Sequence, residues 1–95
     1  MRIPFGWLIE HGLLEPGTEL TDHKRRHKVR VHADGNVIAN GTEKGSIHKI
    51  GATLQGAPSC NGWTYWHIEE NGEYVPIDAL RQRLRAEVET RQTLQ

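Results

Sequence analysis

The sequence predicts an α+β fold: a small, mainly antiparallel sheet with an N-terminal helix, a helix before an aromatic strand, and a C-terminal helix. Apolar residues recur at helical spacing in three segments, near residues 4–11, 47–54 and 76–88, and this period is typical of helices that cover a core with one face. Between these segments lie short runs of β-branched and aromatic residues, which favour strands. Asp-Gly at 34–35 and Asn-Gly at 71–72 are turn signals that join neighbouring strands.

Length and composition indicate one small domain over residues 1–90, followed by a polar tail at 91–95 that we expect to fray. Lysine plus arginine and aspartate plus glutamate both number 12, so no overall positive field attracts a polyanion. The single cysteine excludes an intramolecular disulfide and suits a reducing compartment. No apolar run reaches the roughly 18 residues that a membrane span needs. We therefore expect a cytoplasmic protein that does not enter a membrane.

The first predicted helix covers about residues 4–11. Pro4 suits the first helical position, where its missing N–H would have no partner in any case, and Phe5, Leu8 and Ile9 form an apolar stripe. We expect this helix to cover one side of the sheet rather than to carry a site.

A half-exposed strand is predicted in the second half of residues 21–32. Val29 and Val31 point to one face, and the polar residues that alternate with them point to the other. The Asp-Gly pair then reverses the chain into a return strand at 37–39. Residues 40–44 are predicted to form a polar loop.

Basic residues crowd the stretch that leads into this strand, which we expect to be extended: Lys24, Arg25, Arg26 and Lys28. They could neutralise DNA phosphates, which adds salt-dependent affinity without sequence information. The same charges could instead form a solvated strand face that guards a sheet edge. The sequence leaves both interpretations open.

The aromatic stretch at 63–68 has the residue types of a strand. It follows a helix that Ser46 can cap. A period of two places Trp66 and Ile68 on the core face. The opposite face would present an amide, an indole, a phenol and an imidazole, from Asn61, Trp63, Tyr65 and His67. Such a row is a poor core and a good surface for stacking on bases and for hydrogen-bonding their edges.

Metal binding and nuclease chemistry have weaker support. His23 and His27 would share a face only on a helix, whereas this stretch is predicted to be extended, and the later histidines and Cys60 lack the ligand spacing of zinc sites. A small nuclease using Cys60, Asn61 and His67 would need a carboxylate cluster for a metal or a base paired with the thiol. The sequence indicates neither, so we expect no metal and no catalytic residue.

Three sequence patterns resemble the RAMA domain, a module that accompanies restriction enzymes and adenine methylases. They are Gly-Ser-Ile-His-Lys-Ile-Gly-Ala at 45–52, Asn-Gly-Trp-Thr-Tyr-Trp at 61–66 and Pro-Ile-Asp-Ala-Leu-Arg at 76–81. With Phe-Gly-Trp-Leu-Ile-Glu at 5–10 and Glu-Pro-Gly-Thr at 15–18, the chain up to about Arg85 is similar to the C-terminal domain of cell-cycle-regulated, β-class adenine-N6 DNA methyltransferases, which methylate GANTC.

The resemblance implies a non-catalytic accessory domain that binds double-stranded DNA and helps a methyltransferase to recognise its target. The family's binding residues match Ser46, Asn61 and Trp63, although Ser46 also has the structural role of a helix cap. We expect Trp63 to stack on or wedge against a base and Asn61 to hydrogen-bond a base edge or the backbone. Phosphates would be held by Lys24, Arg25, Arg26, Lys28 and Lys49.

A methyltransferase also needs a glycine-rich loop for S-adenosylmethionine and an Asp-Pro-Pro-Tyr-like motif for the flipped adenine, and the sequence holds neither. We therefore expect no cofactor in this domain, with S-adenosylmethionine and the chemistry in a separate catalytic domain that acts on the nucleoid. The alternative is an interaction module. The aromatic row could pack against that catalytic domain or a second copy of the chain, and zero net charge favours this alternative.

Overall fold

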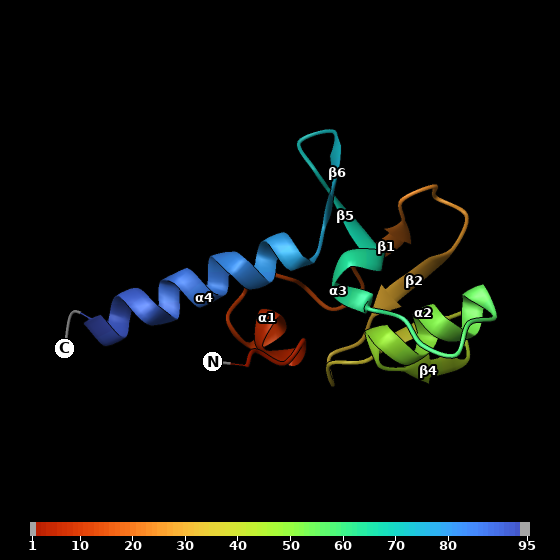
Figure 1. Cartoon of the computed structure of the whole chain (residues 1–95), viewed down its shortest axis with the longest axis horizontal. Helices are drawn as coiled ribbons and strands as arrows, with labels where there is room; N and C mark the ends of the chain where they lie inside the picture. Colours follow the sequence, from red (N-terminus) through yellow and green to blue (C-terminus); the bar gives the residue numbers. More distant parts are fainter. Residues whose placement is uncertain (1, 94–95) are drawn as a thin grey trace.

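The computed structural model describes residues 2–93, and it confirms the predicted α+β fold (Figure 1). Six strands form one sheet in the order β4-β3-β2-β1-β5-β6, and every neighbouring pair is antiparallel. The elements in chain order are α1 (Gly6–Glu10), β1 (Glu19–Asp22), β2 (Lys28–Val31), β3 (Val37–Ala39), β4 (Glu43–Gly45), α2 (Ile47–Gln55), α3 (Gly62–Tyr65), β5 (Trp66–Glu70), β6 (Glu73–Pro76) and α4 (Asp78–Thr93).

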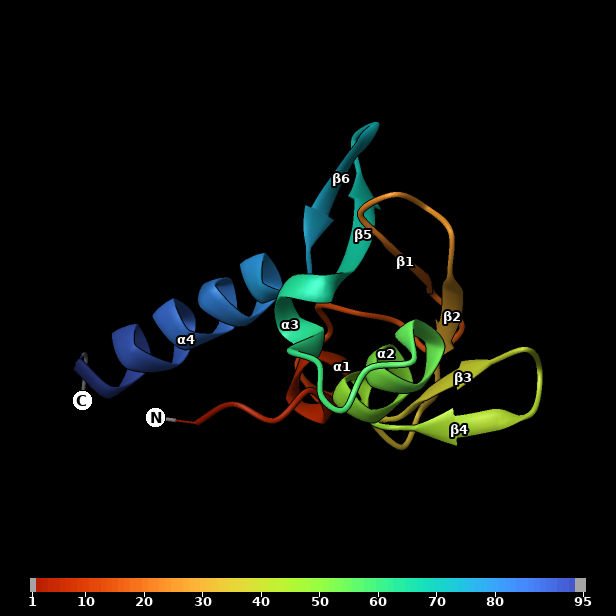
Figure 2. The same cartoon turned by 45° about the vertical axis from the view of Figure 1, so that its right-hand side comes forward.

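The core lies between one face of the sheet and the helices, which gather on that side in Figure 2. Leu20, Val29 and Ala39 are register partners across β1, β2 and β3, and all three are buried. Trp66 from β5 is fully buried and Ile68 partly buried, as the period of two predicts. In the described part of the chain, no helix covers the other face of the sheet. Among residues 2–93, no helix is long and apolar enough to cross a membrane.

The helices form where their local signals predict them. The Ser46 hydroxyl accepts a hydrogen bond from the Lys49 N–H at 3.0 Å, and Gly56 ends α2 in the left-handed conformation with φ of 68°. Helix α4 runs to Thr93 and so includes residues that we expected to fray. The rest of the predicted tail, 94–95, lies outside the described residues.

Two strands were missed by the sequence analysis. Strand β4 occupies part of the predicted polar loop, because Asn40 and Gly41 take positive φ values of 52° and 77° and reverse the chain. This backbone twist matches that of a hairpin, so Lys44 pairs with Ile38 of β3. Strand β1 lies centrally and pairs with both β2 and β5, a position that its four residues alone do not reveal.

The basic stretch between β1 and β2 is a turn, so the prediction that it is extended is wrong. The Asp22 carboxylate accepts hydrogen bonds from the Arg26 N–H at 2.6 Å and the His27 N–H at 3.0 Å. Arg25 takes a positive φ of 58° within this turn. A buried carboxylate therefore satisfies the backbone donors that a continuous strand would have paired with a neighbour.

Asp22 should make the free energy of unfolding depend on pH. Burial would raise its pKa, but the hydrogen bonds from His27 and Arg26, and the positive charges of these residues, outweigh that effect and lower it. Because the folded-state pKa is depressed, the stabilisation is present above the unfolded value of about 3.9 and is lost as pH falls through the folded value. We expect the urea midpoint, followed by circular dichroism, to fall between about pH 5 and pH 2.

The Asp22→Asn variant isolates this contribution, because its amide has no charge to lose while its oxygen can still accept a backbone hydrogen bond. Its midpoint should fall less over the same pH interval than that of the wild type. Equal falls in the two proteins would show that Asp22 is not responsible.

Candidate nucleic-acid interface

The N-terminus of α2 is fixed against the start of α3 and against β5. The Trp66 indole N–H donates to the Ile47 carbonyl at 2.9 Å, and the Gly62 N–H donates to Nδ1 of His48 at 2.9 Å. Gly62 also packs directly on the α2 backbone, since a Cβ there would lie 2.7 Å from the carbonyl carbon and oxygen of Ile47. The first turns of α2 and α3 are therefore side by side.

Four exposed residues share this place, and we call them the α2 N-terminal surface: Ser46, His48, Lys49 and Asn61. Asn61 caps α3 through its Oδ1, which accepts from the Trp63 N–H at 3.1 Å, so its amide NH₂ remains a donor. Since Nδ1 of His48 accepts from Gly62, the neutral imidazole carries its proton on Nε2. Together with the Lys49 ammonium, these groups form a set of donors of the kind that contacts phosphate oxygens.

The predicted aromatic strand face does not form. Residues 62–65 make the helical turn α3 because Asn61 caps it, with the Tyr65 N–H donating to the Asn61 carbonyl at 3.0 Å. In a helical turn, residues three apart point to the same side, so Trp63 joins Trp66 in the core and is only 6% exposed. The strand begins at Trp66, and the placement of Trp63 on an exposed face is wrong.

Trp63 is covered by residues from both ends of the chain. The Arg81 guanidinium of α4 lies 4.4 Å from its ring centroid, and the Phe5 ring lies 5.9 Å away. Arg81 is in turn paired with Asp78 at 2.5 Å. This arrangement makes Trp63 a structural support of α3, and through α3 of the exposed Asn61.

Tyr65 and His67 do not extend the α2 N-terminal surface. Tyr65 is half-buried with its ring edge against Trp66, 4.8 Å between centroids, and burial, followed by the nearby Asp22 and Cys60, raises its pKa. His67 is buried on the sheet face that carries no helix, where its ring lies 5.7 Å from that of His23. The expected row of four side chains is thus divided between the core and two surfaces.

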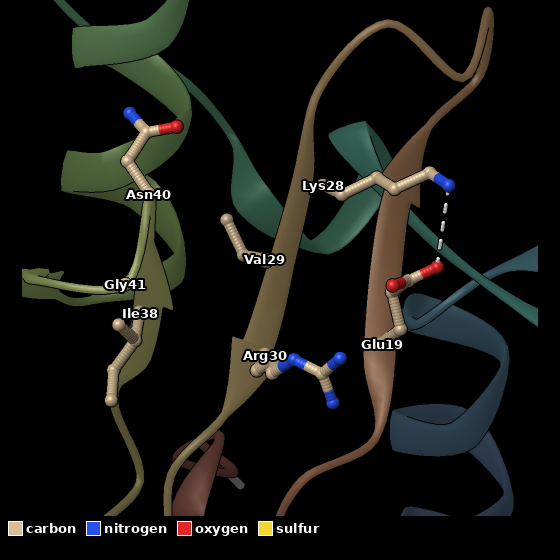
Figure 3. A pocket seen from close by; sticks show the side chains of 7 residues that line it. All are labelled: Glu19, Lys28, Val29, Arg30, Ile38, Asn40 and Gly41. Carbon is tan, nitrogen blue, oxygen red and sulfur yellow. Dashed lines mark ion pairs between the residues drawn. The ribbon is translucent and has the colours of Figure 1, made fainter.

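The basic residues of the 24–28 stretch lie in the β1–β2 turn and at the start of β2. Three already have partners: Arg26 Nε is 3.7 Å from Asp22 and Lys28 Nζ is 3.7 Å from Glu19, while the Arg25 guanidinium lies 5.3 Å from the Tyr74 ring. Figure 3 shows Lys28 and Arg30 projecting from β2 beside a pocket of about 140 Å³. Lys24 is exposed, with no ion pair among residues 2–93.

Comparison with known proteins identifies the family. Residues 1–90 match RAMA, described as Restriction Enzyme Adenine Methylase Associated. The chain belongs to the RAMA family. It is 35% identical over 80 residues to the type II methyltransferase M.HinfI of Haemophilus influenzae, an alignment that covers 84% of this chain and 22% of the relative. The chain thus spans about a fifth of the length of that methyltransferase.

The surroundings of Cys60 and His67, two of the residues considered for nuclease chemistry, are as follows. Cys60 lies against α2, where a Cβ on Gly51 would approach its Sγ to 2.7 Å, and burial raises the pKa of this thiol. His67 faces His23 instead. Over the described part of the chain, no three histidine, cysteine or acidic side chains are grouped to hold a metal.

Sequence reasoning missed two residues that shape the site, His48 and Arg81. Each acts through a residue far along the chain: His48 binds Gly62, fourteen positions away, and Arg81 covers Trp63. The Gly-Ser-Ile-His pattern contained His48, but nothing local indicated that its ring accepts a backbone N–H.

Proposed function

We propose that this RAMA domain is a DNA-binding accessory domain of a site-specific adenine-N6 DNA methyltransferase. The observation that supports this proposal is the α2 N-terminal surface, where Ser46 and Lys49 of the first turn of α2 are joined by Asn61, whose neighbour Gly62 is hydrogen-bonded to His48 of the same turn. Two of these residues match the binding residues that the family resemblance implies. Trp63, the third, contributes from the core by supporting α3.

Phosphate contact is the main role of this surface. Lys49 supplies the charge, and the Asn61 amide supplies donors for a phosphate or a base edge. The α2 dipole also favours an anion near its N-terminus. Lys24, Arg25, Arg26 and Lys28 form a second, weaker contact, since the carboxylates of Asp22 and Glu19 already pair with Arg26 and Lys28.

The chemistry belongs elsewhere in the parent enzyme. We propose that a separate catalytic domain holds S-adenosylmethionine and the flipped adenine, with this domain positioning the duplex. The resemblance of residues 5–10 and 15–18 supports assigning the enzyme to the cell-cycle-regulated class that methylates GANTC. Action on chromosomal DNA places it in the cytoplasm, at the nucleoid.

Charge substitutions that preserve the helix caps test the proposal. Aspartate is an N-cap as good as serine or asparagine, so Ser46→Asp and Asn61→Asp should stay within about 0.5 kcal/mol of wild-type stability. Each should weaken binding to a short duplex by about 1–3 kcal/mol, because a carboxylate would face phosphates. Fluorescence anisotropy at low and physiological salt measures the affinity, and urea denaturation measures the stability.

Ser46→Thr and Asn61→Ser are the matched controls, since they keep a capping side chain without adding charge. Both should bind more tightly than the corresponding aspartate variants. If the aspartate variants bind as well as wild type, DNA does not contact this surface. If wild type fails to bind duplex DNA even at low salt, the proposed function is wrong for the isolated domain.

Docking to the catalytic domain is the second candidate function. It is favoured by the open face of the sheet, where half-buried Ile38 lies among the charged residues Glu19, Lys28 and Arg30. Binding of the catalytic domain that is insensitive to salt would support this role, whereas phosphate contact is strongly salt-dependent. A second copy of the chain at this face would appear as a dimer in solution.

A further inference from the structure

A groove borders the α2 N-terminal surface, and we propose that it binds one unpaired nucleobase of the DNA. This inference rests on the proposed function and adds a ligand subsite to it. The groove runs between α1, the β2–β3 turn and the start of α2 and has a volume of about 400 Å³, within the range of about 300–1,000 Å³ typical of small-molecule sites. Its lining includes Pro4, Phe5, Trp7, Glu10, Asp34 and His48.

The walls of the groove are held close by two glycines. A Cβ on Gly35, at the tip of the β2–β3 turn, would lie 3.2 Å from the Cα of Gly6 in α1. Gly35 also has a φ of 88°, which side chains other than glycine rarely allow. The turn and the helix therefore touch through their backbones, which leaves the side chains beside them to line the opening.

Trp7 supplies an aromatic surface for stacking. Of the three tryptophans, Trp63 and Trp66 are buried, whereas Trp7 is half-exposed and lines the groove. Its indole packs partly against the core, and the His11 ring lies 6.1 Å away. Base–aromatic stacking is the main sequence-tolerant contact in proteins that hold unpaired bases.

The polar groups of the groove match a base edge. The Asp34 carboxylate is held in place by the Lys44 ammonium at 2.5 Å, by His32 at 2.9 Å and by the Asn36 N–H at 3.0 Å. Glu10 is exposed with no ion pair among the described residues, so its carboxylate is available to accept from an exocyclic amino group. His48 adds a donor, because its Nδ1 is occupied by Gly62 and Nε2 carries the proton.

A nucleobase fits this combination better than a phosphate does. The two carboxylates would repel an anion inside the groove, whereas a neutral base offers both a face for Trp7 and amino hydrogens for Glu10. The strand that carries the base would continue past the adjoining Ser46 and Lys49. The groove thus favours adenine, cytosine or guanine, which have an exocyclic amino group, over thymine, which has none.

Fluorescence anisotropy measures the affinity for three DNA probes and so tests base binding in the groove. The probes are a paired duplex, the same duplex with one central unpaired nucleotide, and the single strand. Wild type should bind the duplex with an unpaired adenine at least about fivefold more tightly than the paired duplex. Trp7→Leu should reduce this ratio to about one while affinity for the paired duplex stays the same, and Trp7→Phe should keep most of the preference. Glu10→Leu, which has no acceptor for an exocyclic amino group, should remove the preference for unpaired adenine over unpaired thymine.

Tyr74→Leu is the control, since Tyr74 is exposed on the opposite face of the sheet, and its ratio should equal that of wild type. Equal wild-type affinity for the paired and unpaired probes would show that the groove does not bind an unpaired base, while the proposed function would stand. If the protein binds the single strand through Trp7 but does not bind the paired duplex, base binding in the groove is supported and the proposed function is wrong. Binding of none of the probes overturns both.

Discussion

Replacing Trp63 with alanine should lower the free energy of unfolding by about 3–5 kcal/mol. The indole is 6% exposed and packs between Phe5 and the Arg81 guanidinium, so its removal leaves a cavity and an uncovered cation. Domains of this size have a total stability of about 5–15 kcal/mol. The loss should therefore be visible as a large drop in the urea midpoint, and in a less stable domain as complete unfolding.

Tyr74→Ala is the matched surface control, because Tyr74 is an aromatic residue that is 44% exposed and its loss should change stability by no more than about 0.5 kcal/mol. Trp63→Phe should retain part of the packing and fall between the two. A Trp63→Ala variant with wild-type stability and weakened DNA binding would contradict the buried placement and restore the stacking role that the sequence suggested.

Features encoded by neighbouring residues could be predicted from the sequence. Helix α2 is an example, because the Ser46 cap, the apolar positions within the helix and the left-handed Gly56 lie within eleven positions of one another. The hairpin between β2 and β3 depends similarly on its Asp-Gly pair. In these segments, capping, periodicity and turn chemistry all favour the same structure.

The prediction of a strand that begins at Trp63 was wrong because the sequence pattern is compatible with both a strand and a helical turn. Trp63 and Trp66 lie on opposite faces of a strand but on the same face of a helix. The density of aromatic residues favoured a strand, whereas Asn61 favours a helix start, and the cap prevails for one turn before β5 begins. A turn of four residues is too short for periodicity to reveal it.

Only part of the candidate site could be predicted from the sequence, and the reason differs from that for the aromatic stretch. Ser46 and Asn61 were identified as candidates, but their proximity depends on Gly62 packing against Ile47. The groove depends likewise on the contact of Gly6 with Gly35, 29 positions along the chain. Such contacts are fixed by the packing of the whole domain, and no local pattern specifies them.

Gly62→Ala should therefore be strongly destabilising, by about 1–3 kcal/mol or more. A Cβ at this position would lie 2.7 Å from the Ile47 carbonyl carbon and oxygen. These are backbone atoms in the first turn of α2, so they cannot rotate away as a flexible side chain would. The variant can fold only if α3 moves away from α2, which would also break the Gly62–His48 hydrogen bond. Urea denaturation gives the change in stability.

Gly6→Ala is the matched control, because it makes the same substitution where there is room. Its Cβ would meet the Gly35 Cα at an ordinary 3.7 Å, and alanine favours the helical conformation of α1 by up to about 1 kcal/mol. Its stability should equal or exceed that of wild type. If Gly62→Ala were just as stable, α3 could not lie against α2 as described. If Gly62→Ala folds with reduced stability, its DNA affinity should fall as well, because Asn61 would leave Ser46 and Lys49.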